Sequence, residues 1–250
     1  MLNTIVTGKP TEKTPLLIAH GLFGSARNWG VIARRLSDAR QVVAVDMRNH
    51  GESPWYPTHG YEDMARDLAK VIEAHGGRMD VLGHSMGGKA AMVLALQQPQ
   101  AVGRLVVADI APTAYGHTQT HLIDAMRRVD LSRVERRADA AAQLAVEDDA
   151  LRAFLLQSLD VGGRKWRLNL DVLAAEMERI TGFPPVEGRF RGPALFLTGA
   201  ESSYVRPEHR SEIKRLFPAA RFAKIPGAGH WLHAERPREF EAAVRAFLDG

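Results

Sequence analysis

Short apolar runs separated by amphipathic helical patterns are the feature of this sequence that most limits its fold. Runs of this length without polar alternation are typical of strands that are buried on both faces. Between most of them lie helical patterns, such as residues 61–77, in which apolar side chains recur at helical spacing and Gly76 ends the helix. Alternating strands and helices predict an α/β fold with a mostly parallel sheet flanked by helices. The expected strands are residues 15–19, 41–46, 79–83, 104–109, 193–199 and 221–225.

One long interval interrupts this alternation. From about residue 112 to residue 191 the sequence has helical patterns but no comparable strand run, only a turn at Gly162 and Gly163 followed by RKWRLNL. Such an interval is too long for an ordinary crossover between two strands. We therefore expect an α/β core made of residues 1–111 and 192–250. The insertion, residues 112–191, is expected to form a helical cap over one edge of the sheet.

The composition is typical of a folded, soluble protein. Hydrophobic residues make up 45% of the 250 residues and charged residues 25%, which fits a single domain. Cysteine is absent, which removes disulfides and thiolate metal sites and fits a reducing compartment. Because neither a secretory leader nor an apolar run of membrane-spanning length stands in the sequence, we expect a cytoplasmic protein without a membrane span.

The basic residues do not by themselves indicate a nucleic-acid partner. The net charge is +4, and the arginines gathered in residues 126–140 alternate with acidic residues, as on a solvated helix face. A landing patch for an anionic substrate tail is the alternative interpretation. Nucleic-acid binding is less favoured still, because no known binding module accompanies the charge. The sequence does not indicate an oligomeric state.

A serine between two glycines is the first candidate for chemistry. Ligands of a parallel sheet bind beyond the carboxyl ends of its strands, so the residues that follow each apolar run matter most. The run 79–83 leads into Gly83-His84-Ser85-Met86-Gly87 and then into a helix-forming segment. This G-x-S-x-G pattern is typical of a nucleophile elbow, a strained strand-to-helix turn that exposes the serine hydroxyl. A chance match is the alternative, but the position between strand and helix favours Ser85 as the nucleophile.

A serine hydroxyl needs a base to take its proton, and His230 is the best candidate among ten histidines. His230 follows the last apolar run and precedes the final helical pattern, where a loop can bring an imidazole to the elbow. The order serine, acid, histidine along the chain also places the histidine last. His84 flanks the serine but should project differently, and we expect His233 to be an exposed or packing residue.

The residues alone leave two candidates for the acid that orients the histidine. In many proteins of this fold it follows the penultimate strand, but that position holds Ser202, which cannot supply a negative charge. Glu201 is adjacent and is the reserve candidate. Asp109 closes the apolar run 104–109 at the same edge of the sheet, although an aspartate there can also be a simple turn cap. We favour Asp109 as the acid.

Acyl transfer also needs donors for the developing oxyanion. The segment AHGLFGS follows the first expected strand and can supply one backbone N–H, from Leu22 or from the neighbouring Phe23. The N–H of Met86, directly after the serine, should supply the other. We expect His20 to be a structural hydrogen-bonding residue, and His50 to lie in a rigid turn beneath the site without a direct catalytic role.

Five segments together carry a family resemblance: HGLFGS, DMRNHGES, GHSMGGKAAM, ADIAP and GAGHWLHAE. The chain resembles α/β-hydrolase-fold esterases of the YbfF type and their mitochondrial relatives, nearly from end to end and including KWRLNL in the expected cap. The resemblance implies that the acid comes from the strand-end aspartate, here Asp109. It also implies a serine at the more usual acid position, as Ser202 is here.

The expected activity is hydrolysis of carboxylic ester or thioester bonds of small acyl substrates through an acyl-serine intermediate, with no metal or organic cofactor. Four large side chains, Phe23, Trp166, Tyr204 and Trp231, are the candidates for lining an apolar acyl site, although such residues are equally common in cores. A lyase or carbon–carbon bond hydrolase of the same fold is one alternative, because fold alone does not decide the reaction. A non-catalytic ligand receptor is the other.

Overall fold

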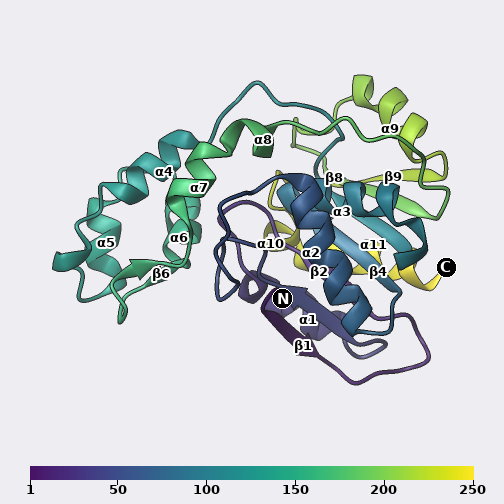
Figure 1. Ribbon diagram of the computed structural model, residues 1–250, viewed down its shortest axis with the longest axis horizontal. Coiled ribbons are helices and arrows are strands. Elements are labelled where there is room, and N and C mark those ends of the chain that lie inside the picture. Colours follow the sequence, from purple (N-terminus) through teal and green to yellow (C-terminus); the bar gives the residue numbers. More distant parts are fainter.

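A seven-stranded sheet forms the centre of the computed structural model, which describes residues 1–250 (Figure 1). Six neighbouring strands are parallel, and only the edge strand β1 (Thr4–Thr7) runs antiparallel, against β3. The order across the sheet is β1, β3 (Val42–Val45), β2 (Leu16–Ala19), β4 (Met79–His84), β5 (Val102–Ala108), β8 (Ala194–Gly199) and β9 (Ala220–Ile225). The expected mostly parallel α/β fold is therefore confirmed.

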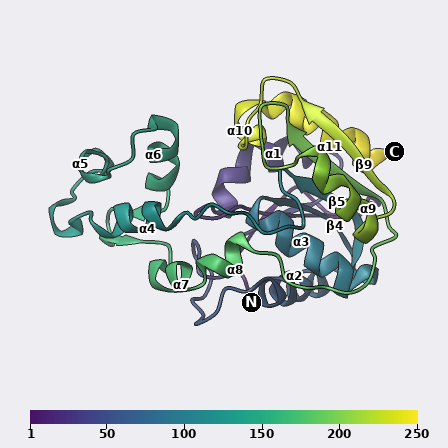
Figure 2. The ribbon, with the colours of Figure 1, turned by 90° about the horizontal axis from the view of Figure 1, so that it is seen from above.

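Helices cover both faces of this sheet. As a result, the four-residue strands β2 and β3 are buried on both sides. Alternate residues face opposite ways: Leu17 and Val43 join one apolar core, whereas Leu16 and Val42 join the other. One face is packed by α2 (Tyr61–Ala74), α3 (Met86–Gln97) and α9 (Arg210–Leu216). The other is packed by α1 (Gly30–Leu36), α10 (Leu232–Glu235) and α11 (Pro237–Asp249), as Figure 2 shows from above.

Residues between β5 and β8 form a lobe to one side of the sheet (Figures 1 and 2). Its helices are α4 (Thr120–Arg127), α5 (Arg137–Gln143), α6 (Asp149–Leu156), α7 (Leu170–Ala175) and α8 (Met177–Thr181). The lobe also contains a short hairpin of β6 (Leu159–Asp160) and β7 (Lys165–Trp166), which the absence of an apolar run had hidden. Its buried residues join the same apolar core as the face covered by α2 and α3. None of the helices in the structure combines the length and the hydropathy that crossing a membrane requires.

Candidate active site

Ser85 sits at a sharp turn between β4 and α3. Its backbone has φ 51° and ψ −119°, a conformation that a non-glycine residue adopts only under strain. The two flanking glycines explain how the turn is possible. A Cβ on Gly83 would lie 2.3 Å from the carbonyl oxygen of Gly87, and a Cβ on Gly87 would lie 2.4 Å from the carbonyl oxygen of Ala19. The backbone can take this path only where both positions lack side chains.

The side chains of Ser85, His230 and Asp109 form a continuous hydrogen-bonded chain. The Nε2 atom of His230 lies 3.1 Å from the Ser85 hydroxyl oxygen, and its Nδ1 atom lies 2.8 Å from Asp109 Oδ2. An ionised carboxylate can only accept, so the hydrogen of the neutral imidazole lies on Nδ1 and the lone pair on Nε2 faces the serine. These three residues stand at the ends of β4 and β5 and in the loop after β9, and the fold brings them together.

The Asp109 carboxylate is fully buried and collects three donors. Besides His230, it accepts the backbone N–H of Gly199 at 3.1 Å and the hydroxyl of Ser202. Charge-assisted hydrogen bonds of this kind offset the cost of burying a carboxylate. Glu201, the reserve candidate, has an exposed side chain with no hydrogen bond to His230. The position after the penultimate strand therefore contributes a hydroxyl that binds the Asp109 carboxylate.

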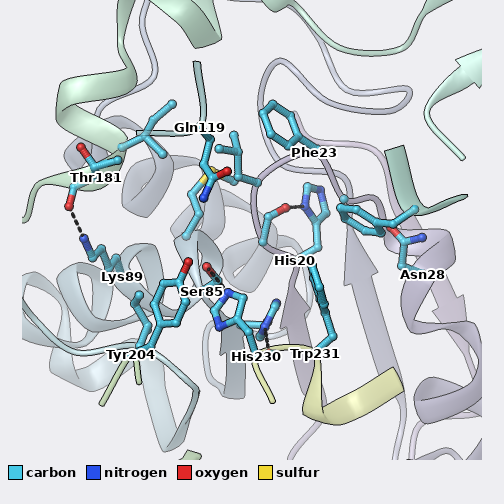
Figure 3. Close-up of a pocket in the computed structure, with 18 of the residues that line it drawn as sticks. His20, Phe23, Asn28, Ser85, Lys89, Gln119, Thr181, Tyr204, His230 and Trp231 are labelled. Atoms are coloured by element: carbon cyan, nitrogen blue, oxygen red, sulfur yellow. Dashed lines mark hydrogen bonds between the residues drawn. The ribbon is translucent and has the colours of Figure 1, made fainter. Parts of the chain in front are cut away.

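Two aromatic side chains hold His230 in place. The ring of Tyr204 stacks on its imidazole, with centroids 3.9 Å apart and planes 16° apart (Figure 3). On the backbone side, the ring of His84 donates from Nε2 to the carbonyl oxygen of His230 at 2.8 Å. Burial, and then the nearby His233 and His230, lower the pKa of His84 well below its usual value, so it is a neutral donor. No sequence pattern indicates this contact, beyond the presence of a polar residue beside the elbow.

Two free backbone donors lie near Ser85, one in the loop after β2 and one at the first residue of α3. The N–H of Phe23 is already used, because it donates to His50 Nε2 at 3.2 Å. The N–H groups of Leu22 and Met86 have no acceptor within the protein. Of the two residues considered for the first donor, Leu22 is thus the one whose N–H is available to a substrate oxygen.

A cavity of about 290 Å³ opens around Ser85, with lining residues from both the sheet edge and the lobe. Phe23, Tyr204 and Trp231 are among the lining residues. The lobe contributes Leu122, Leu151 and Phe154, which no sequence pattern had marked as site residues. The expectation for Trp166 is corrected: this residue does not line the cavity. It is buried within the lobe, where its indole N–H donates to the carbonyl oxygen of Met126.

Lys89, four residues after Ser85 on α3, is a lining residue with an unusual environment. Its side chain is 1% exposed, and burial lowers its pKa to about 7. The amine donates to the carbonyl oxygens of Thr181 at 2.8 Å and Gly182 at 2.5 Å, at the end of α8. Figure 3 shows it directed toward Thr181 and away from Ser85. The amine therefore links the helix of the elbow to the lobe and is not poised as a second base.

Known proteins match this chain over nearly its whole length. The alpha/beta hydrolase fold family matches residues 14–237. The sn-1-specific diacylglycerol lipase ABHD11 of Mus musculus is 45% identical over 93% of this chain and 80% of its own length. Esterase YbfF of Escherichia coli (strain K12) is 39% identical over 95% of this chain and 94% of its own.

A solved structure of another protein also has the same fold as this chain. A marine microorganism esterase superposes with a TM-score of 0.92 at 37% identity, covering 98% of each chain. Sequence matches above 30% identity and a family match across most of the chain agree with the elbow and the parallel sheet described above. The chain belongs to the α/β-hydrolase fold family and is related to esterase YbfF and to the ABHD11 lipases.

Proposed function

We propose that Ser85, His230 and Asp109 are the nucleophile, base and acid of a carboxylic ester hydrolase. One observation carries the proposal: the hydrogen-bonded chain from the Ser85 hydroxyl through both nitrogens of His230 to the buried Asp109 carboxylate, at the base of a mostly apolar cavity. The activity class agrees with the esterase and lipase relatives. A thioester of the same acyl group is a second substrate for this chemistry.

The proposed reaction follows from the geometry. His230 takes the Ser85 proton through Nε2 while the serine oxygen attacks the acyl carbon, and the charge on the imidazolium is stabilised by Asp109 at Nδ1. The N–H groups of Leu22 and Met86 donate to the oxyanion that develops on the carbonyl oxygen. His230 then gives its proton to the leaving alcohol or thiol. In the second half, His230 activates water, which releases the acid and restores Ser85.

We also propose that residues 112–191 act as a cap that supplies one wall of the substrate site. Leu122, Leu151 and Phe154 come from this lobe and face a cavity whose other wall includes Phe23 and Trp231. Such a lining favours an apolar acyl chain over a charged one. The cytoplasmic location stays a prediction, which fractionation of the native cells would test.

The test is the initial rate on p-nitrophenyl esters from acetate to palmitate, for the wild type, Ser85→Ala, Asp109→Asn and Glu201→Gln. We expect Ser85→Ala to lose essentially all turnover and Asp109→Asn to lose about 10⁴-fold in kcat, because the asparagine favours the wrong imidazole tautomer. Glu201→Gln is the matched control. Its kcat should stay within about twofold of the wild type, because substitutions of exposed side chains without specific contacts usually have small effects. Full activity in Asp109→Asn, or its loss in Glu201→Gln, would show that the acid is wrongly assigned.

A further inference from the structure

Phe23, in the loop after β2, holds a backbone conformation that needs an explanation. Its φ is +64°, in the left-handed region that a bulky side chain rarely adopts. Both polar groups of the residue are bonded to side chains from distant parts of the chain. The N–H donates to His50 Nε2 at 3.2 Å, and the carbonyl oxygen accepts the hydroxyl of Ser158 at 2.9 Å. Strain at such a residue persists only where its surroundings determine it fully.

The hydrogen bonds of His50 leave its Nε2 lone pair free to accept this N–H. The side chain is fully buried, and its Nδ1 hydrogen donates to the carbonyl oxygen of Arg48 at 2.8 Å, which leaves the lone pair on Nε2 for Phe23. Burial, and then the nearby His20 and His59, lower the pKa of His50 well below its usual value. An imidazolium has no lone pair, so only the neutral ring can make both bonds.

His20 holds the preceding peptide by its carbonyl oxygen. Its Nδ1 donates to the carbonyl oxygen of Gly21 at 2.8 Å (Figure 3), and its Nε2 accepts the N–H of Met47 at 2.9 Å. The Gly21 carbonyl and the Leu22 N–H belong to one planar trans peptide and point in opposite directions. Fixing that carbonyl therefore fixes the direction of the Leu22 N–H. Two successive peptides of the loop are thus each bonded to one imidazole, and the rings lie 5.1 Å apart.

The turn that carries His50 is itself anchored on both sides. The Asp46 carboxylate accepts the N–H groups of Ala26 at 2.7 Å and Glu52 at 2.9 Å, which closes the turn. On the other side the turn is bonded to the lobe. The Gly51 N–H donates to the carbonyl oxygen of Arg167 at 2.8 Å, and a β-bridge pairs His50 with Leu168. The lobe thus reaches the Phe23 peptide both directly, through Ser158, and through this turn.

We propose that His50 is a positioning residue of the reaction: by accepting the Phe23 N–H it holds the loop so that the Leu22 N–H stays directed at the substrate oxyanion. This proposal rests on the proposed function, because it assigns the Leu22 N–H as an oxyanion donor. His50 never touches the substrate. Its contribution is realised in the transition state, when the oxyanion forms, and is nearly absent when the neutral ester binds.

The test compares His50→Leu, which removes the acceptor, with His50→Gln, whose amide oxygen can lie close to the position of Nε2. Each is assayed for kcat and KM on the best p-nitrophenyl ester and for inhibition by a trifluoromethyl ketone with the same acyl group, whose adduct with Ser85 places an alkoxide in the oxyanion site. His75→Leu is the matched control, because His75 is a half-buried histidine at the end of α2 that bonds only the Val71 carbonyl.

We expect His50→Leu to lower kcat by about 10- to 100-fold, less than or comparable to the loss of an oxyanion donor, with KM changed less than about threefold. The ketone's Ki should rise by the same factor as kcat falls. His50→Gln should recover most of both, and His75→Leu should match the wild type. A purely structural role would lower the melting temperature without separating kcat from KM and without rescue by glutamine.

The proposal is overturned if folded His50→Leu keeps kcat and the ketone Ki within about twofold of the wild type, or if glutamine fails to restore either. Should His50→Leu not fold, Ser158→Ala decides in its place: it frees the carbonyl oxygen of Phe23 and should lower kcat at unchanged KM. An unchanged kcat in Ser158→Ala would then refute the proposal that the bonds to Phe23 position the loop. Failure of the proposed function looks different, because then the wild type itself would show no Ser85-dependent turnover.

Discussion

The buried histidines should make this protein unusually sensitive to mild acid. His59 and His233 are buried within the core around the site, and burial lowers the pKa of each to about 3. In the unfolded chain the same rings titrate near 6.5. Between these values the unfolded state binds protons that the native state does not, so the free energy of unfolding must fall as pH falls below about 6.5.

The size of the effect follows from the two pKa values. At pH 5 an unfolded histidine is almost fully protonated and a native one with a pKa of about 3 is not, which costs about 2 kcal/mol per residue relative to pH 7.5. His59 and His233 together give a loss of about 4 kcal/mol. Burial also lowers the pKa of His20, His50 and His84, so their contributions have the same sign and make this figure a minimum. A domain is typically stable by only about 5–15 kcal/mol, so much of the stability should disappear by pH 5.

The assay is urea unfolding followed by far-ultraviolet circular dichroism at pH 7.5, 6.5, 5.5 and 5.0. Staying at or above pH 5 keeps the exposed carboxylates ionised and separates their titration from that of the histidines. His233→Phe is the informative variant, because the ring of His233 stacks on Trp29 at 4.1 Å and a phenyl ring can keep that contact. It should reduce the slope of unfolding free energy with pH, near pH 5.5, by about 1.2 kcal/mol per unit. A wild-type stability that is flat from pH 7.5 to 5, or an unchanged slope in the variant, would refute the reasoning.

Three further predictions concern buried residues beside the sheet and in the helix that follows Ser85. Because the pKa of Lys89 is about 7, the unfolding free energy should rise by about 1.4 kcal/mol per unit between pH 8 and 9.5, and Lys89→Met should abolish this rise in urea titrations. Gly87→Ala should give little folded or active protein, because its Cβ would meet the Ala19 carbonyl; a normal melting temperature and kcat would contradict the elbow geometry. Arg40→Met should destabilise the fold by about 3–5 kcal/mol in urea, since it leaves the buried Asp80 without the guanidinium 2.8 Å away, and a loss below about 1 kcal/mol would contradict this.

The strands were predictable where burial on both faces leaves a plain sequence pattern. Each of the six expected runs overlaps a strand of the structure, with ends that differ by at most two residues. The edge strand β1 was not predicted, because its residues TIVT are half exposed and mix polar with apolar side chains. The hairpin of β6 and β7 was missed for a related reason: strands of two residues are too short to show any periodicity.

Whether a site residue could be predicted depends on what positions it. Some residues are positioned by their neighbours in sequence, and others by contacts with distant parts of the chain. Ser85 and the Met86 N–H are set by the glycines around them, so a local pattern sufficed to single them out. In the sequence, Trp166 and Trp231 look alike, because each is a large aromatic residue near a loop. Only Trp231 lines the cavity. What decides is the Met126 carbonyl, forty residues away in sequence, which the indole of Trp166 binds. No local pattern contains that information.

The choice of acid shows why spacing alone left two candidates. Asp109 reaches His230 because β5 and β8 pair in register from Leu105 with Ala194 to Ala108 with Leu197, which sets the end of β5 beside the loop that follows β8. The residue then takes a left-handed φ of +52°, with its N–H donating to the Leu197 carbonyl at 2.9 Å, and its carboxylate meets both His230 and the Ser202 hydroxyl. Neither the register nor the positive φ can be read from the segment ADIAP. If Asp109 supplies the charge, Ser202 needs only to donate, so Ser202→Ala should keep far more turnover than Asp109→Asn. Equal losses in the two variants would mean that the serine hydroxyl, and not the carboxylate alone, sets the orientation of His230.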